Sequence, residues 1–265
     1  MSSLSGKTVI VTGSGAGLGR VIAKTYLEAG ANVAICDISE DRVKSTAAEF
    51  EPSHAGRVHS AVVDVADEAS VASLLTSTVS AFGRVDVLVN NAGIMDSFDG
   101  VATLTKATWD RVMGVNALGP FLASRAAVNQ FLAQEGEAAG GIIINISSSA
   151  SIRGTAAGAA YTASKHALVG LTKNTAGHYG PRGIYAVALS LGGMPNTEIA
   201  KSQPPETFNM EGFGVMRTTL PGFDPETNAV ALEDVAKYCV FLSDRSIAAT
   251  ANGSNIVFNK NWPTA

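Results

Sequence analysis

The stretch TVIVTGSGAGLGRVIA, residues 8–23, joins a short apolar run to a glycine-rich turn and then to a helical pattern. An uninterrupted apolar run is typical of a strand buried on both faces, as in a parallel sheet. The glycines leave the backbone of the turn uncovered, and the helix directs the positive end of its dipole at the same point. This context predicts a binding site for the pyrophosphate of a dinucleotide, formed by Gly13, Gly15, Gly17, Leu18 and Gly19.

The same alternation continues along the chain. Apolar runs that predict strands lie at 8–12, 32–36, 58–63, 85–89, 141–146, 183–189 and 255–258. Helical patterns lie between them at 18–29, 40–50, 68–82, 106–134, 160–179 and 233–242. Strands that alternate with helices imply right-handed crossovers. We therefore expect an α/β fold of the Rossmann type, a doubly wound parallel sheet with helices on both faces, as a single domain over residues 1–265.

Composition excludes several classes of protein. Hydrophobic residues make up 46% and charged residues 16% of the chain, so a sizeable core is available. The net charge of −4 is spread without long runs of one sign, which argues against nucleic-acid binding. We find neither a signal peptide nor an apolar stretch of the ~20 residues that a membrane span needs. Cys36 and Cys239 are isolated, so we expect a cytoplasmic protein without disulfides or a metal site.

One segment, 192–229, does not follow the alternation of predicted strands and helices. It is rich in proline and glycine and contains no strand pattern. A long irregular segment inside a compact domain is usually functional or disordered. We interpret it as a loop that covers a substrate pocket, and the alternative is a surface insertion.

Asp37 ends the second predicted strand and bears on the choice of cofactor. A carboxylate there can accept hydrogen bonds from both hydroxyls of an adenosine ribose, and it repels a 2′-phosphate. Its neighbours Ser14, Gly15 and Ile38 are not cations, so NAD(H) is favoured over NADP(H), with Ile38 beside the adenosine. The alternative role for Asp37 is to cap the next helix, which Ser39 can do equally well.

The ends of the third and fourth strands add further candidates. Asp64 and Val65 are candidates for contact with the adenine, although an Asp at this place can simply form a turn. Asn91, Ala92 and Gly93 close the fourth strand, where small and amide side chains suit a cofactor lying over the edge of the sheet. The alternative is an ordinary Asn-Ala-Gly turn.

Tyr161 and Lys165 stand four positions apart on a predicted helix, among small residues. They therefore share one face. An ammonium beside a phenol favours the phenolate, so we expect the tyrosine pKa to fall below its ordinary ~10. Ser148 ends the fifth strand, where a hydroxyl can bond a carbonyl oxygen; Ser147 and Ser149 are equally placed. The alternative is a tyrosine packed at an interface beside a solvated lysine.

These motifs together resemble the short-chain dehydrogenase/reductase family over nearly the full length of the chain. The motifs are Thr12-Gly13 with Gly17 and Gly19, Asn90-Asn91-Ala92-Gly93, Asn116 in VNALGPF, Ser148 in NISS, and Tyr161 with Lys165 in YTASK. The resemblance implies seven parallel strands, a homo-oligomer that is a tetramer or a dimer, and NAD(P)-dependent interconversion of secondary alcohols and ketones.

The resemblance also implies roles for four residues. Tyr161 would be the general acid/base, and Ser148, chosen among the three serines on this ground, would orient the substrate oxygen. Lys165 would lower the pKa of the tyrosine and hold the nicotinamide ribose, and Asn116 would position a water that links Lys165 to solvent. From the sequence alone, Asn116 reads as a polar residue in the middle of a helix, bonded locally.

Two places depart from the family pattern. Leu191 stands where proline is usual, next to the expected nicotinamide contacts Gly192, Met194 and Thr197, and 259–261 replaces a common Asp-Gly-Gly. These changes leave two alternatives open. One is a redox-neutral enzyme, such as a dehydratase or epimerase, and the other is a regulatory protein that only binds the cofactor.

The predicted substrate is a small apolar ketone or secondary alcohol, because apolar residues follow the strand ends and occupy the 192–229 segment. These are Ile94, Met95, Phe98, Ile152, Met194, Phe208, Phe213, Val215 and Met216. Arg153 either meets an anionic group or is solvated.

Overall fold

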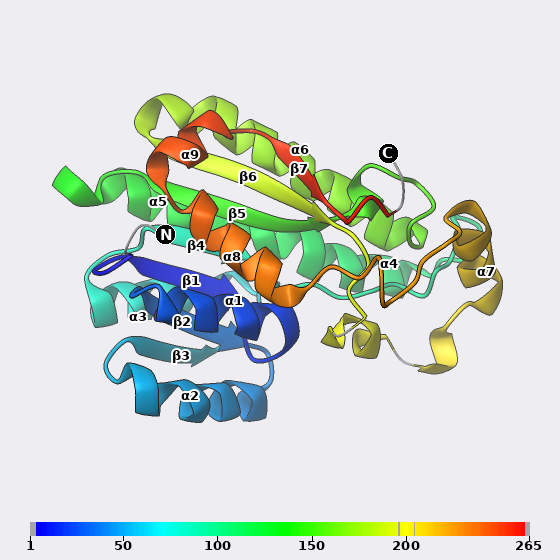
Figure 1. Ribbon diagram of the computed structural model, residues 1–265, viewed down its shortest axis with the longest axis horizontal. Helices are drawn as coiled ribbons and strands as arrows, with labels where there is room; N and C mark the ends of the chain where they lie inside the picture. The colour runs from blue at the N-terminus through cyan, green and yellow to red at the C-terminus, as the bar shows by residue number, and fades with distance from the viewer. Residues whose placement is uncertain (1–3, 196, 204, 263–265) are drawn as a thin grey trace.

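Seven strands form one sheet in which every pairing is parallel, in the order β3-β2-β1-β4-β5-β6-β7 (Figure 1). The computed structural model describes residues 4–195, 197–203 and 205–262. The strands are β1 (Thr8–Thr12), β2 (Asn32–Asp37), β3 (Val58–Val62), β4 (Val87–Asn90), β5 (Gly141–Ser148), β6 (Ile184–Leu191) and β7 (Asn255–Phe258). The predicted doubly wound parallel sheet is confirmed.

Helices cover both faces of the sheet and enclose two cores (Figure 1). The first core lies under α1 (Gly17–Glu28), α2 (Glu40–His54), α8 (Leu232–Leu242) and α9 (Arg245–Thr250). The second lies under α3 (Glu68–Phe82), α5 (Gly119–Ala133) and α6 (Ala159–Tyr179). Because side chains alternate along a strand, Val9 and Val11 of β1 enter the first core and Ile10 enters the second.

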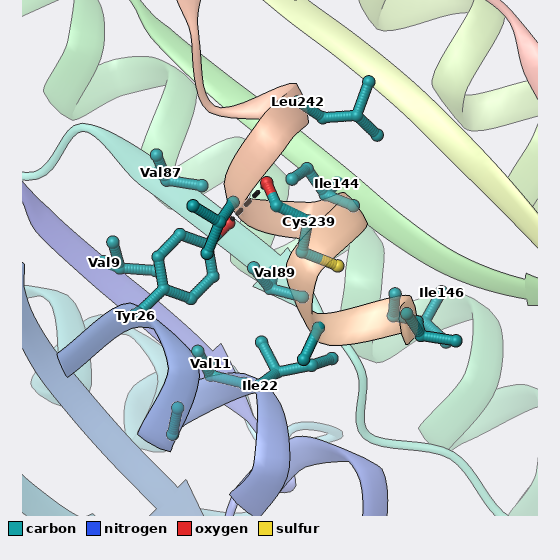
Figure 2. Packing of buried hydrophobic residues seen from close by; sticks show 14 of the residues in the cluster. Val9, Val11, Ile22, Tyr26, Val87, Val89, Ile144, Ile146, Cys239 and Leu242 are labelled. Atoms are coloured by element: carbon teal, nitrogen blue, oxygen red, sulfur yellow. Dashed lines mark hydrogen bonds between the residues drawn. The ribbon is translucent and has the colours of Figure 1, made fainter. Parts of the chain in front are cut away.

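Tyr26 links two helices within the first core. Its ring is fully buried between Val9, Ile22 and α8 (Figure 2). Its hydroxyl donates to the carbonyl of Cys239 at 3.0 Å and lies 2.7 Å from the hydroxyl of Ser243. A buried phenol needs such a partner, so this contact fixes α1 against α8 and holds the helix that begins at the glycine-rich turn.

The long helix predicted over 106–134 is confirmed as an uninterrupted helical run from Lys106 to Ala133, but a π-type turn lies in its middle. The structure has α4 (Lys106–Met113), one wide π-type turn over Gly114–Leu118, and then α5. Pro120 has no N–H to donate to the carbonyl four residues earlier, so regular helical bonding cannot run through this point. The wide turn carries Asn116, which is fully buried. Such turns often mark functional sites.

The segment 192–229 is less irregular than predicted. It contains α7 (Met210–Thr219) and short 3₁₀ turns at Glu198–Ser202 and Pro205–Thr207. None of the residues of α7 is buried, and Gly212 and Gly214 lie inside it, so its sequence gives only a weak signal for a helix. Figure 1 shows α7 beyond the carboxyl ends of the strands, away from the sheet. Helix α9 was also absent from the prediction.

Leu191 continues β6 where proline would stop it. It pairs with Ser148 of β5 and with Phe258 of β7, and the N–H of Gly192 then donates to the carbonyl of Phe258 at 3.1 Å. A residue with an N–H can extend a ladder that proline cannot. The residue that departs from the family pattern therefore takes part in the ladder with β5 and β7 at the end of β6. In the described part of the chain, every helix is too short or too polar to cross a bilayer.

Candidate active site

Two adjoining cavities open at the carboxyl ends of the strands, where parallel α/β sheets bind ligands. The larger has a volume of about 420 Å³ and the smaller about 230 Å³. Both are bordered by Ser147, Tyr161, Met194, Thr197 and Ile199. Tyr161 therefore lies where the two cavities meet.

Most of the residues predicted to hold a cofactor line the larger cavity. They are Gly13, Gly17, Leu18, Gly19, Asp37, Ile38, Asp64, Val65, Asn91, Ala92, Gly93, Tyr161, Lys165, Met194 and Thr197. Gly192 borders the smaller cavity instead. Gly15 borders neither cavity. A Cβ on Gly15 would lie 2.7 Å from the Cβ of Arg42 and 2.8 Å from that of Asp37. Its role in the structure is to let β2 and α2 approach the turn.

The glycine-rich turn has the properties that a pyrophosphate requires. Gly13 adopts φ +64°, and a Cβ on it would lie 2.9 Å from the Cα of Ala92. A Cβ on Gly19 would lie 2.3 Å from the carbonyl oxygen of Gly13. Helix α1 has no side-chain cap at Ala16 and no acidic residue in its first turn, so its first N–H groups remain available to an anion. The residues present therefore fit a dinucleotide.

Asn91, directly after β4, connects two neighbouring turns. The side chain of Asn91 donates to the carbonyls of Thr12 at 2.8 Å and Gly13 at 3.2 Å. The Thr12 hydroxyl in turn accepts from the N–H groups of Asn91 and Ala92, at 3.0 Å each. Asn91 thus borders the cavity while its amide holds the glycine-rich turn in place.

The structure separates the two roles weighed for Asp37, which lines the larger cavity. Ser39 caps α2 by accepting from the N–H of Arg42 at 3.4 Å, while Asp37 accepts from the N–H of Ser39 at 3.0 Å. Asp37 is therefore not the helix cap. Asp64 was expected either to contact the adenine or to form a turn. It forms a turn, because its side chain accepts from the N–H of Ala66 at 2.9 Å, and it lines the larger cavity as well.

Tyr161 and Lys165 are both buried, with 6% and 3% of their surfaces exposed. The ammonium nitrogen of Lys165 lies 5.4 Å from the centroid of the Tyr161 ring and donates to the carbonyl of Ile146 at 3.0 Å. Burial lowers the pKa of Lys165 to about 8, because it disfavours the charged form.

The expectation that the pKa of Tyr161 falls is wrong for the protein by itself. Burial raises that pKa to about 12, a hydrogen bond from Ser148 lowers it by less, and the charge of Asp96 raises it further. Desolvation of the phenolate outweighs the neighbouring hydroxyl. The lysine lies over the ring rather than on the phenolic oxygen, so it does not reverse the balance.

The three serines at the end of β5 all border the smaller cavity. Ser148 accepts from the N–H of Ala150 at 3.2 Å and interacts with the Tyr161 phenol. Ser147 has a buried hydroxyl without a hydrogen-bond partner among the described residues, and it borders both cavities. Ser148 is therefore the serine that interacts with the tyrosine, and its role toward a substrate oxygen stays a prediction.

Asn116 holds the loop after β4 rather than bonding within its own helix. Its side chain accepts from the N–H of Ile94 and donates to the carbonyl of the same residue, both at 2.9 Å. It also donates to the Ser164 hydroxyl of α6 at 3.2 Å. A Cβ on Gly93 would lie 3.5 Å from the Asn116 amide oxygen and 3.6 Å from Lys165 Nζ, so both polar atoms border Gly93.

The smaller cavity is apolar except for its serine and tyrosine end and Thr197. Its apolar lining is Met95, Phe98, Ala156, Leu191, Met194, Ile199, Met216, Leu220 and Trp262. Of the other residues predicted for a pocket, Ile94 lines the larger cavity, and Phe208 and Phe213 pack on Phe98 with ring centroids 5.4 and 5.2 Å away. Ile152, Arg153 and Val215 do not line either cavity among the described residues.

Sequence reasoning missed four residues at the site. Arg42 adds a cation to the lining of the larger cavity, and Arg111 donates to the carbonyls of Ser202 and Met95 at 3.1 and 3.3 Å. Asp96 binds the first turn of α6, and Trp262 closes the smaller cavity. Arg42 follows Asp37 closely in sequence, so its position could have suggested it. Arg111, Asp96 and Trp262 carry no local signal, because each acts across a long stretch of chain. No group of side chains suited to a metal ion occurs in the described residues.

Comparison with known proteins gives a consistent result. The family model for short chain dehydrogenases matches residues 7–207. A short chain dehydrogenase/reductase, dpchG, of Colletotrichum higginsianum is 41% identical over 261 residues, covering 98% of this chain and 95% of the relative. The 3beta-hydroxysteroid dehydrogenase 2 of Eggerthella lenta is 33% identical over 260 residues, with 98% and 95% covered.

A solved structure agrees over its whole length. The 3-ketoacyl-(acyl-carrier-protein) reductase of Brucella melitensis, complexed with NADH, matches with a TM-score of 0.82 and 27% identity, covering 97% of this chain and 98% of that one. With the family model and the relatives, this match shows that the chain belongs to the short-chain dehydrogenase/reductase family and is an oxidoreductase acting on CH–OH groups with a nicotinamide cofactor.

Proposed function

We propose that the chain is an NAD(H)-dependent oxidoreductase that interconverts a secondary alcohol and a ketone, with Tyr161 as general acid/base. The observation that carries this proposal is the place of Tyr161 between the two cavities. One cavity carries the features of a dinucleotide site, and the other is an apolar chamber with hydroxyls at one end. A group that exchanges a proton with the substrate must stand at such a junction.

The chain's own residues would handle the proton. The nicotinamide cofactor, when bound, supplies the hydride chemistry. In ketone reduction Tyr161 donates its phenolic proton to the substrate oxygen, and in alcohol oxidation the phenolate accepts it. Ser148 donates a hydrogen bond to that oxygen. Lys165 would stabilise the phenolate through its charged ammonium; because its pKa is about 8, it keeps that charge below about pH 8.

The preference for NAD(H) follows from Asp37 at the adenosine end. Its carboxylate, 9% exposed, would accept from the ribose hydroxyls and repel a 2′-phosphate. Arg42 lines the same cavity and would narrow that preference, because a guanidinium attracts phosphate. We expect the carboxylate to dominate, since it is more buried than the exposed arginine.

The proposed substrate is a small, uncharged and largely apolar ketone or alcohol. None of the described residues that line the smaller cavity carries a formal charge. The segment 192–229 would cover this substrate, because Met194, Ile199, Met216 and Leu220 contribute to the wall. The name of the Eggerthella lenta relative, a 3beta-hydroxysteroid dehydrogenase, supports an apolar ring compound.

We further propose that the chain forms a homo-oligomer, a tetramer or a dimer. Two separate faces carry exposed apolar side chains. Trp109 of α4, Leu118 of the π-type turn and Phe121 of α5 form one face, and Phe241 of α8 and Val257 of β7 form the other. Light scattering coupled to gel filtration would measure the assembly, and a monomer at micromolar concentration would contradict the proposal.

The test of the activity is an absorbance assay at the reduced-nicotinamide band. Purified protein is mixed with NAD+ or NADH and a panel of secondary alcohols or ketones that vary in ring number and charge. We expect turnover with uncharged apolar members and little with carboxylates. A bound cofactor that never changes its redox state across the panel would favour a redox-neutral or regulatory protein instead.

A further inference from the structure

Asp96 lies in the loop after β4 and is completely buried. Its carboxylate accepts three backbone hydrogen bonds. One oxygen accepts from the N–H of Tyr161 at 2.8 Å, and the other accepts from Gly158 and Phe98, at 3.1 Å each. Both oxygens are therefore engaged, and two of the three donors belong to the start of α6.

Helix α6 lacks a cap of its own. Its N-cap is Gly158, which has no side chain, and its first turn contains no acidic residue. The first N–H groups of a helix need acceptors, and a carboxylate there also interacts well with the helix dipole. Asp96 supplies this acceptor from a distant part of the sequence. A Cβ on Gly158 would lie 2.6 Å from its oxygens, so a glycine is required for the approach.

The position of the bond matters for Tyr161. Among the N–H groups of α6, the carboxylate accepts at 2.8 Å from that of the tyrosine itself. The backbone from which the phenol projects is thereby fixed to the loop that follows Gly93, and this loop also borders the larger cavity. Misplacement of a reacting group by as little as 1 Å can cost roughly 100-fold in rate.

We propose that Asp96 is a positioning residue for proton transfer at Tyr161, holding the tyrosine backbone against the loop that borders the cofactor cavity. This inference rests on the proposed function of Tyr161. A carboxylate is required because both of its oxygens accept. An amide has one acceptor oxygen and one NH₂ group, so an asparagine would turn a donor toward either Tyr161 or the pair Gly158 and Phe98.

The charged and titratable groups that face the phenol are few among the described residues. Lys165 lies over the ring from the same helix, and Asp96 raises the pKa of the phenol from the loop after β4. β5 contributes only the Ser148 hydroxyl. Arg111 of α4 is bound to the carbonyls of Met95 and Ser202. Removing the charge of Asp96 therefore lowers the pKa of Tyr161.

The test compares Asp96→Asn with Asp67→Ala. Asp67 caps α3 by accepting from Ser70, and it lines neither cavity. Its replacement therefore weakens a helix cap without touching the site. With saturating NAD(H) and the best substrate of the panel, we expect Asp96→Asn to lower kcat roughly 10- to 100-fold. We expect KM and the Kd for NAD(H) to stay within about twofold, and the alkaline limb of the kcat profile to move to lower pH.

A second measurement does not depend on turnover. With tyrosine labelled by ¹³C at Cζ, the Tyr161 resonance is assigned as the one absent from Tyr161→Phe. We expect it to begin its alkaline titration at lower pH in Asp96→Asn than in the wild type or in Asp67→Ala. An unchanged kcat would overturn the positioning role of Asp96, whatever the titration shows. A wild type inactive on every substrate would instead contradict the proposed function, and with it a role of Asp96 in proton transfer. The resonance would then show only whether the Asp96 carboxylate acts on the phenol.

Discussion

The ammonium nitrogen of Lys165 lies 5.4 Å from the centroid of the Tyr161 ring while it donates a 3.0 Å hydrogen bond to the carbonyl of Ile146. Burial lowers the pKa of the lysine to about 8 and raises that of the tyrosine to about 12. Burial thus disfavours the charged form of each group. At neutral pH the protein alone holds a protonated phenol beside an ammonium that gives up its proton readily, which suits donation to a ketone.

The buried lysine should cost stability. We expect Lys165→Met to raise the free energy of unfolding at pH 7 by about 2 kcal/mol, because each unit of lowered pKa is worth about 1.4 kcal/mol and the lost bond to Ile146 offsets part of the gain. The folded pKa, about 8, lies below the ordinary 10.5, so the penalty is complete below pH 8 and fades as pH rises toward 10.5. Urea unfolding at pH 7 and pH 10 measures this.

Lys173→Met serves as the control, because Lys173 is exposed on the same helix. It should change stability little, and equally at both pH values. If Lys165→Met were destabilising at pH 7, or if its effect did not depend on pH, the burial cost assigned to this lysine would be wrong.

We expect Asp37 and Arg42 to have opposite effects on the choice between NAD(H) and NADP(H). Asp37→Ala should weaken NAD(H) binding roughly 10-fold, because hydrogen bonds to a charged group contribute about 1.5–3 kcal/mol. The variant should therefore prefer NAD(H) over NADP(H) by a smaller factor than the wild type does. Arg42→Ala should weaken NADP(H) and leave NAD(H) nearly unchanged. Fluorescence titration with both cofactors measures the four dissociation constants.

Asp41→Ala is the matched control, because it removes the same charge from an exposed position that does not line the cavity. It should leave both cofactors unaffected. A wild type that already prefers NADP(H) would show that Arg42 outweighs Asp37, and the assignment to NAD(H) would then fail.

Trp262 closes the smaller cavity from the end of the chain. Its indole N–H donates to the carbonyl of Pro221 at 3.0 Å, and its ring lies 4.6 Å from that of Phe223, centroid to centroid. Trp262→Ala should therefore enlarge the cavity. In the substrate panel we expect kcat/KM to shift roughly 10-fold toward bulkier ring ketones, because apolar contacts of this size discriminate by about 1–3 kcal/mol.

Phe82→Ala controls for the loss of an aromatic ring. Phe82 ends α3, on the side of the sheet where the strands begin, and contacts His59. Its removal should leave the ratio between small and bulky substrates unchanged. The same ratio in Trp262→Ala and the wild type would mean that Trp262 does not limit the substrate.

The fold was predictable because its signals are local. The continuous apolar runs of strands such as β1 and β4 predicted burial on both faces of the sheet. Gly13 and Gly17 occupy positions where the backbone adopts positive φ. The order of the motifs then marked Tyr161 and Lys165 as candidate catalytic residues. These features depend on neighbours in sequence, so a single chain reveals them.

The remaining features depend on distant partners. The wide turn that buries Asn116 is fixed by Ile94 and Ser164, and the cap on α6 comes from Asp96 across a long loop. The pKa of Tyr161 went the other way from the prediction because the i, i+4 spacing shows proximity to a charge but not desolvation. Burial is a property of the whole fold.

The most direct test of the account is Tyr161→Phe, measured for both turnover and NAD(H) affinity beside Tyr185→Phe, a tyrosine in β6 that contacts Arg245. Removing only the hydroxyl from Tyr161 should lower kcat by at least roughly 10²-fold while the Kd for NAD(H) stays within about twofold. Tyr185→Phe should leave both kcat and the Kd for NAD(H) at their wild-type values. Turnover retained by Tyr161→Phe at the wild-type rate would contradict the claim that this phenol carries the proton.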